Sequence, residues 1–337
     1  MIEVRNLRKT FRTSRRYPGF RGAIKGLFTR EVTETKAVDG LSFDIADVEI
    51  VGYIGANGAG KSTTIKMMTG TLTPTSGSVL VDGLLPYERR VENARRIGVV
   101  FGQRTQLWWD LPLSESFSLL KDIYEVGDAD YARRLAFLDE VLGLRDFMLS
   151  PVRTLSLGQR MRADLAASLL HQPRILYLDE PTIGLDVVVK DRVREAVKRI
   201  NREYGTTVIL TTHDLDDIEE LCTRIIVIDS GRLVWDGSLE ELRARYGQRR
   251  ELRLRLGGTD GGRGAEAAIG TALRALDPGA SLGREEEELV LGFDRSRVGL
   301  GALVPALMAV AEVLDWSIRE TKIEEIVKLI YAGEIRS

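Results

Sequence analysis

A loop of eight residues, Gly55–Ser62 with the sequence GANGAGKS, constrains the fold of this chain more than any other segment. Apolar residues over 49–54 predict a buried strand before the loop, and residues 63–68 predict a helix after it. Glycines at this spacing let consecutive backbone N–H groups surround an anion at the N-terminus of a helix. The pattern therefore predicts a loop that holds the phosphates of a nucleotide, with Lys61 at the β- and γ-phosphates and the Ser62 hydroxyl on Mg²⁺.

The composition limits the classes of protein to which the chain can belong. Its 337 residues favour two domains over one, and 44% hydrophobic with 29% charged residues is typical of globular proteins. A net charge of −2 argues against a dedicated nucleic-acid-binding protein. The single cysteine, Cys222, cannot form a disulfide within the chain, which fits a reducing cytosol. No run of 18 apolar residues is present, so we expect any role at a membrane to depend on a partner protein.

Polar residues follow three further apolar segments that predict strands. They are Gln103 after residues 96–101, Asp179 and Glu180 after residues 174–178, and His213 after residues 206–211. Two adjacent carboxylates are tolerated at the end of a buried strand only at an exposed edge and with partners. In doubly wound sheets, ligands bind outside the carboxyl ends of the strands. The pattern therefore predicts that these side chains lie near the phosphate-binding loop.

Two segments interrupt the predicted α/β pattern. Apolar residues recur at helical spacing between 112 and 144, which predicts an all-helical insert. The other segment comes after a first strand that we predict to end near Phe11. Between 12 and 30 it contains six basic residues and no acidic residue, and its apolar residues over 17–28 form a helical stripe. This basic segment has two interpretations, a helix that docks on a membrane surface or a partner, and a solvated excursion between two strands.

Six motifs over roughly residues 1–240 resemble, in the same order, those of ATP-binding cassette (ABC) ATPases, the motor subunits of ABC transporters. They are the Walker A loop Gly55–Ser62, the Q-loop glutamine Gln103, the signature motif Leu155–Gln159, the Walker B strand Ile175–Asp179 with Glu180 after it, the D-loop Gly184–Asp186 and the switch histidine His213. Phe11 lies where this family has an aromatic residue that stacks on adenine. Leu157 departs from the usual glycine of the signature motif but leaves Ser156 and Gly158 in place.

The resemblance implies an α/β fold, a P-loop NTPase of the ABC cassette type, whose mixed sheet core is accompanied by an antiparallel β subdomain and a helical insert. We place the nucleotide-binding domain at 1–240, with the helical subdomain at about 104–170 and the basic insert at 12–35. Alternating strand and helix patterns predict a small α+β domain at 248–337. This second domain is expected to be a regulatory or dimer-stabilising appendage.

The resemblance also implies a role for each site residue. Glu180 would orient and deprotonate the attacking water, His213 would contact the γ-phosphate, and Gln103 would act with them. Ser62, Asp179 and Gln103 would hold Mg²⁺ directly or through water. The residues expected to contact ATP are Phe11, Gly55, Asn57, Gly58, Gly60, Lys61, Ser62, Thr63, Ser156, Gly158, Gln159 and Asp186.

The partners follow from the same resemblance. The chain has one Walker A loop and one signature motif, so it must form a homodimer, or a heterodimer with a paralogous chain, to enclose ATP. In this family the dimer drives separate polytopic membrane permease subunits from the cytoplasmic face of the cell membrane, where it is peripheral, and no nucleic acid is expected as a partner. Trp108 and Trp109 follow Gln103 at the groove that receives a helix of the membrane subunit. These tryptophans either dock there or pack against the helical insert.

The direction of transport and the class of ATPase leave alternatives. The segment 318–326 resembles the C-terminal end of ATPases that serve exporters, so we expect export, with an importer ATPase as the alternative. A soluble cassette ATPase acting on DNA or ribosomes is less favoured, because the chain has neither long coiled coils nor a second cassette. A P-loop kinase or GTPase would lack the signature motif.

Overall fold

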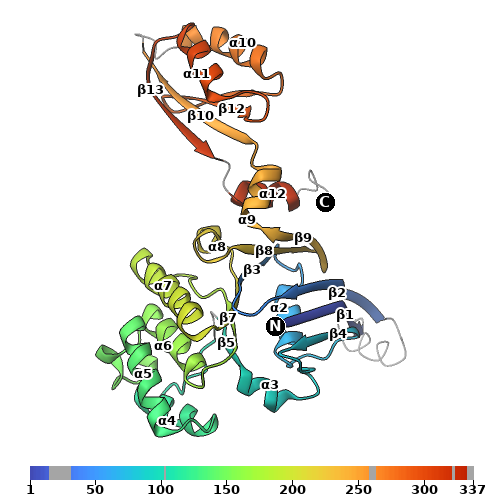
Figure 1. The fold of residues 1–337 in the computed structure, drawn as a ribbon, viewed down its shortest axis with the longest axis vertical. Helices are drawn as coiled ribbons and strands as arrows, with labels where there is room; N and C mark the ends of the chain where they lie inside the picture. The colour runs from blue at the N-terminus through green and yellow to red at the C-terminus, as the bar shows by residue number, and fades with distance from the viewer. Residues whose placement is uncertain (15–31, 102–103, 258–262, 321–322, 332–337) are drawn as a thin grey trace, which may run out of the picture. The chain divides into compact units, whose positions relative to one another are not determined.

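The computed structural model describes residues 1–14, 32–101, 104–257, 263–320 and 323–331. The chain divides into two compact units, Met1–Gly237 and the part from Ser238 onward. Figure 1 follows the first unit from blue to yellow and the second from yellow to red.

A six-stranded sheet forms the centre of the first unit, with the strand order β5-β6-β7-β3-β8-β9. The strands are β3 (Ile50–Gly55), β5 (Ile97–Phe101), β6 (Ile175–Asp179), β7 (Thr207–Thr211), β8 (Arg224–Asp229) and β9 (Arg232–Ser238). Strands β5, β6, β7, β3 and β8 pair in parallel. Their carboxyl ends therefore meet at one edge, where the register places Phe101, Asp179 and Thr211 side by side.

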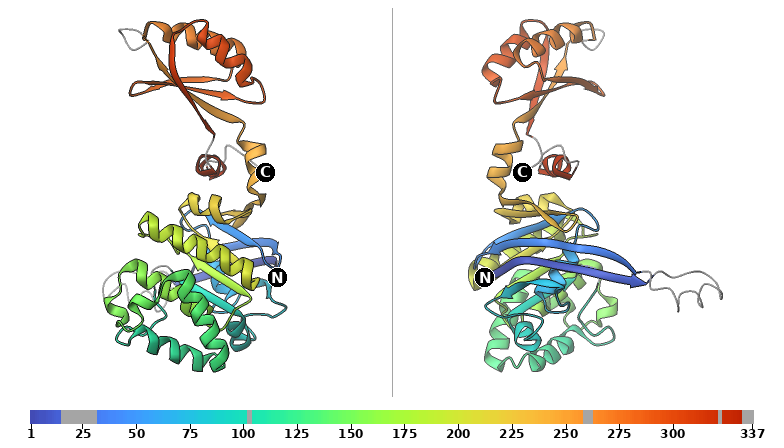
Figure 2. Two further views of the ribbon diagram at one scale, coloured as in Figure 1. Left: turned by 60° about the vertical axis from the view of Figure 1, so that its left-hand side comes forward. Right: turned by 90° about the vertical axis from the view of Figure 1, so that its right-hand side faces the viewer.

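An antiparallel sheet with the order β2-β1-β4 lies beside it, made of β1 (Ile2–Ser14), β2 (Val32–Ile45) and β4 (Ser76–Val81). Strands β1 and β2 pair along their whole length, as the two long blue strands of Figure 2 show. The first strand was predicted to end near Phe11, but it continues to Ser14, and β2 already begins at Val32. Residues 12–14 and 32–35 of the predicted basic insert are thus strand residues, and the helix expected over 17–28 lies outside the described residues.

Helix α2 (Lys61–Met68) packs between the two sheets and joins their cores. It contacts β3 of the parallel sheet and both β2 and β4 of the antiparallel sheet. Met67 and Met68 are completely buried there, together with Ile2 and Tyr53. Burying a large apolar side chain contributes about 1.5–3 kcal/mol. This packing fixes α2, and with it the loop that precedes the helix, against both sheets.

Among its described residues, the first unit has six further helices. They are α3 (Arg90–Arg96), α4 (Leu113–Ile123), α5 (Asp128–Leu142), α6 (Leu157–Leu169), α7 (Val187–Tyr204) and α8 (Leu215–Leu221), with single 3-10 turns at Arg145–Phe147 and Val152–Thr154. The segment predicted to be helical contains α4 and α5, drawn in green in Figure 1 beside α6. Among the described residues, no helix has the length and apolar character needed to cross a bilayer.

The second unit is an α+β domain with its own core. Its antiparallel sheet has the order β11-β12-β10-β13. The elements are α9 (Leu239–Tyr246), β10 (Arg249–Leu256), a 3-10 turn (Arg263–Ala265), α10 (Glu266–Leu276), β11 (Ser281–Glu285), β12 (Glu288–Asp294), α11 (Leu300–Met308), β13 (Val313–Glu320) and α12 (Ile323–Tyr331). Leu252, Leu254 and Leu256 of the central strand β10 are buried in this core, because alternate residues of a strand face the same side.

Candidate nucleotide-binding site

The loop between β3 and α2 is shaped to hold an anion. Gly58 and Gly60 have φ of 82° and 107°, a backbone conformation that favours glycine. At Gly60 a Cβ would also lie 2.4 Å from the carbonyl oxygen of Ala37, so no larger residue fits. Helix α2 begins directly after Gly60, and no side chain caps its N-terminus. The N–H groups of its first turn therefore remain available to a ligand, at the positive end of the helix dipole.

Lys61 lies inside this loop and is only 9% exposed. Its Nζ donates to the carbonyl oxygens of Gly55 at 2.5 Å and Ala56 at 3.3 Å. Burial lowers the pKa of Lys61, and the charges of Glu180 and Asp179 oppose that shift. A buried ammonium that donates to carbonyl oxygens, and has no carboxylate within ion-pair distance among the described residues, is suited to bind a strongly anionic ligand.

The carboxylates at the end of β6 are fixed by residues from β7 and the segment after it. The Thr211 hydroxyl donates to Asp179 Oδ1 at 2.5 Å. The Glu180 backbone N–H donates to the carbonyl oxygen of Thr211 at 2.8 Å, and His213 Nε2 lies 3.1 Å from Glu180 Oε1. Glu180 has a φ of 55°, a left-handed conformation that costs a non-glycine residue on the order of 1–3 kcal/mol. The surrounding structure must therefore hold Glu180 in place.

These groups converge on one cavity of about 490 Å³, a size suited to a nucleotide. The residues that line it are Ala37, Ala56, Asn57, Gly58, Gly60, Lys61, Ser62, Thr63, Ile65, Lys66, Phe101, Arg104, Asp179, Glu180 and His213. Ammonium, hydroxyl, carboxylate and imidazole groups thus face the same space as the N-terminus of α2. The arrangement can bind a polyphosphate and present a base to a water molecule beside it.

Comparison with known proteins assigns the family. Residues 38–183 match the family described as ABC transporter. The daunorubicin/doxorubicin resistance ATP-binding protein DrrA of Streptomyces peucetius is 34% identical over 294 residues, which cover 87% of this chain and 87% of DrrA. This chain belongs to the ABC transporter ATP-binding proteins. An ABC ATP-binding subunit binds ATP and is an ATP hydrolase, so the predicted fold class and enzyme class are both confirmed.

Two further ABC proteins are similar. The methionine import ATP-binding protein MetN of Corynebacterium efficiens is 31% identical over 239 residues, covering 66% of this chain and 63% of MetN. The solved structure "Dimeric structure of a post-hydrolysis state of the ATP-binding cassette MJ0796 bound to ADP and Pi" matches with a TM-score of 0.58 and 26% identity. That match covers 71% of this chain and 99% of the other.

The structure does not bring all predicted ABC site residues to the cavity. Ser156 caps α6 by accepting from the backbone N–H of Gln159, whose side chain accepts in return from the Ser156 N–H. Asp186 caps α7 by accepting from Val189 N–H, and a Cβ on Gly158 would meet the side chain of Val189 at 3.1 Å. The starts of α6 and α7 are thus adjacent, but none of these residues is among those that line the cavity.

Two other predicted residues, Phe11 and Gly55, are also not among those that line the cavity. Phe11 is 41% exposed, pairs with Thr35 and has Lys9 Nζ 5.5 Å from its ring centroid. Gly55 contributes its carbonyl oxygen to Lys61 and is itself packed against Ile228. Gln103 lies outside the described residues.

Sequence reasoning missed Thr211, Phe101, Arg104 and Ala37 as members of the site. Thr211 directly precedes Thr212 and His213, and it pairs in register with Asp179. Had β6 and β7 been assumed to pair in parallel, the Thr211 hydroxyl would have been expected beside Asp179. Ala37 comes from the antiparallel sheet, and no motif in the sequence marks it.

Asp164 of α6 lies beneath the segment that follows the predicted Q-loop. It is 6% exposed, and its Oδ1 accepts from the Thr105 hydroxyl at 2.8 Å and the Gln106 N–H at 3.1 Å. Burial raises the pKa of Asp164 to about 6, although these hydrogen bonds oppose the shift. The two tryptophans that follow, Trp108 and Trp109, are 38% and 49% exposed, so neither is packed inside the helical insert.

The free energy of unfolding of the wild type is expected to fall as the pH rises from 4 to 6, and Asp164→Asn is expected to make this fall smaller. Between pH 4 and pH 6 the folded chain holds a proton on Asp164 that the unfolded chain has released, so the wild type loses stability as the pH rises through this window. The difference in free energy of unfolding between wild type and variant should change by on the order of 2 kcal/mol from pH 4 to pH 7. Urea unfolding of both proteins at pH 4 and pH 7 measures this difference. The same difference at both pH values would contradict the view that the Asp164 carboxylate causes the pH dependence.

Proposed function

We propose that this chain is the ATPase subunit of an exporter and drives separate membrane permease chains. The observation that carries the proposal is the convergence of Lys61, Asp179, Glu180 and His213 on one cavity at the N-terminus of α2. The similarity to DrrA, whose name records drug resistance, supports export. MetN is named for import, so an importer ATPase is the second candidate.

Different residues of the cavity carry out different steps of ATP hydrolysis. The N–H groups at the start of α2 and the Lys61 ammonium bind the β- and γ-phosphates. The Glu180 carboxylate orients the attacking water and accepts its proton. His213, within 3.1 Å of Glu180, contacts the γ-phosphate and keeps the carboxylate turned toward the water.

The donor set fits Mg²⁺, which prefers oxygen ligands and shares them with bound phosphates. Ser62 and Asp179 both line the cavity, and Thr211 fixes one oxygen of Asp179. In our proposal these two residues hold the ion, with Gln103 as a third ligand. The ion would neutralise charge on the β- and γ-phosphates.

We propose that two cassettes enclose the nucleotide, as a homodimer or as a heterodimer with a paralogous chain. Ser156, Gly158, Gln159 and Asp186 would contact ATP across the dimer interface, which agrees with their position away from the cavity of their own chain. Leu157, Val187 and Val188 beside them are exposed and apolar, as suits a surface that a partner covers. The solved structure of MJ0796 is described as dimeric.

The remaining assignments concern the membrane and the second domain. We propose that the exposed side chains of Trp108 and Trp109, which follow the cavity residue Arg104 in the chain, bind a polytopic permease subunit at the cytoplasmic face of the membrane. We also propose that the cassette extends over 1–240. The domain at 248–337 is then an accessory that regulates the cassettes or stabilises their dimer.

Purification of the tagged protein from solubilised membranes tests this function. We expect polytopic membrane proteins to copurify with the wild type. The double variant Trp108→Ala/Trp109→Ala should recover far less of them. Trp316→Ala is the matched control, since Trp316 is 45% exposed but lies on β13 of the second unit. Recovery of ribosomes or DNA in place of membrane proteins would contradict the transporter function. If the double variant recovers as much membrane protein as the wild type, the two tryptophans are not the docking surface, but the transporter function stands.

A further inference from the structure

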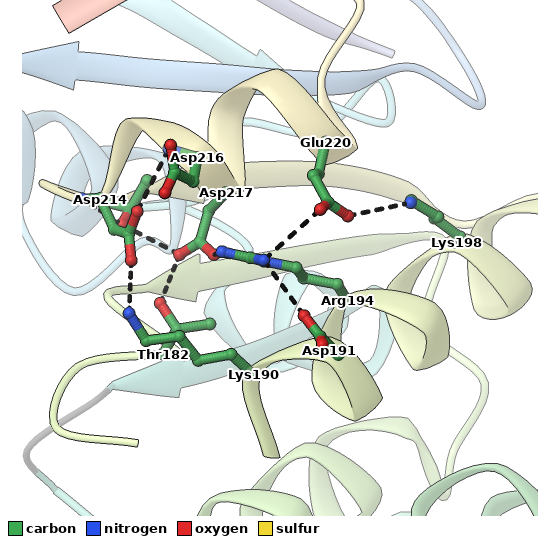
Figure 3. Close-up of polar contacts among 10 residues, drawn as sticks. Thr182, Lys190, Asp191, Arg194, Lys198, Asp214, Asp216, Asp217 and Glu220 are labelled. Carbon is green, nitrogen blue, oxygen red and sulfur yellow. Dashed lines mark hydrogen bonds and ion pairs between the residues drawn. The ribbon is translucent and has the colours of Figure 1, made fainter. Parts of the chain in front are cut away.

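A buried ion pair joins α7 to α8 (Figure 3). Asp217 of α8 accepts from Arg194 of α7 at Oδ1, with 2.7 Å to Nε and 2.6 Å to Nη2. The Asp217 side chain is fully buried and that of Arg194 is 9% exposed. Arg194 Nη1 also lies 3.3 Å from Asp191 and 3.6 Å from Glu220.

The other oxygen of Asp217 reaches the two segments that carry Glu180 and His213. Its Oδ2 accepts from the hydroxyl of Thr182, two residues after Glu180, and from the hydroxyl of Thr212 at 3.3 Å, one residue before His213. Figure 3 shows Thr182 directed toward Asp217 from the loop before α7. A single carboxylate therefore links both segments to α7.

Neighbouring contacts hold the His213 segment further. The Thr212 hydroxyl accepts from Asp214 N–H at 2.9 Å, and Lys190 Nζ of α7 lies 2.5 Å from Asp214 Oδ2. Asp214 is in turn the N-cap of α8 and accepts from the Asp216 N–H at 3.1 Å. The segment 212–214 is thus tied at both ends to α7 and α8.

The free energy of folding alone does not explain this buried network. A buried ion pair gains little over apolar residues of the same volume, because both charges lose their hydration. Its hydrogen bonds, however, fix geometry, and two observations require fixed geometry here. Glu180 has a left-handed φ of 55°, and its carboxylate lies 3.1 Å from His213.

We propose that Asp217 and Arg194 are positioning residues for ATP hydrolysis. Through Thr182 and Thr212 they hold Glu180 and His213 in the relative positions that hydrolysis requires. Arg194 acts by fixing the Asp217 carboxylate, and neither residue touches the nucleotide. The inference rests on the proposed roles of Glu180 and His213.

The test compares Thr182→Val with Thr182→Ser, because valine has nearly the shape of threonine but cannot donate to Asp217. We expect Thr182→Val to lower kcat by about 10-fold or more, with the KM for ATP changed less than about 3-fold, since the phosphate-binding loop is untouched. Thr182→Ser keeps the hydroxyl and should restore most of kcat. Thr212→Val and Thr212→Ser repeat the comparison on the His213 side.

Two controls make the result decisive. Arg199→Met removes an arginine of the same helix that bonds Glu203 and Glu140 at the surface, and it should leave kcat unchanged. Glu180→Gln, measured alongside, tests the proposed function itself. If Glu180→Gln abolishes turnover while both valine variants keep wild-type kcat, the positioning role is wrong and the function stands. If the valine variants lose melting temperature but not kcat, the network is only structural and the inference is overturned.

Discussion

Replacing Glu180 with glutamine is expected to lower ATP turnover by about 10²- to 10⁴-fold while ATP binding is retained. Glutamine has the same shape but cannot accept a proton from water. Lys61 and the start of α2 line the cavity independently of Glu180, so the affinity for ATP should stay near that of the wild type. Phosphate release measures turnover, and ATP-dependent dimerisation on gel filtration measures binding and closure.

Glu195 on α7 provides a matched control for the substitution at Glu180. Glu195→Gln makes the same chemical change at an exposed position of α7 and should leave turnover unchanged. Normal turnover in Glu180→Gln would show that another group is the base. Failure of Glu180→Gln to bind ATP would show that the carboxylate serves the structure of the loop, whose backbone is already strained at this residue.

The core of the site could be predicted because local sequence determines it. The loop Gly55–Ser62 needs glycines at fixed positions, and its strand and helix neighbours show their own periodicity. Asp179, Glu180 and His213 follow apolar strands, and the rule that ligands bind at the carboxyl ends places them together without knowledge of the strand order. In the structure these residues line one cavity with Lys61.

The supporting residues could not be predicted in this way, since they depend on pairing across the fold. Asp217 follows Asp214 and Asp216 in a polar stretch that suggests a solvated helix face, yet its side chain is fully buried against Arg194. Arg194 is one of many basic residues on α7, and nothing local distinguishes it from Arg199 at the surface. A buried pair between two helices becomes visible only when the helices are placed.

Lys61→Ala is expected to weaken ATP binding by about 10- to 100-fold and to lower turnover with it. The ammonium is the only cationic side chain bonded within the described phosphate loop, and a hydrogen bond to a charged group contributes about 1.5–3 kcal/mol. Burial lowers the pKa of Lys61, so without ATP the charged side chain opposes folding at neutral pH. We therefore expect the nucleotide-free variant to melt no lower than the wild type. Titration of a fluorescent ATP analogue and thermal melts with and without ATP measure the two effects.

The comparison with Lys66 separates a specific role of Lys61 from general positive charge. Lys66 lines the same cavity but is exposed, so Lys66→Ala should cost much less affinity, because the solvent screens its charge. Equal losses in both variants would mean that the cavity attracts ATP by its overall charge and that the loop geometry adds little. A large loss in Lys61→Ala alone, with unchanged melting without ATP, places the binding energy in the ammonium that the loop carbonyls of Gly55 and Ala56 hold at the N-terminus of α2.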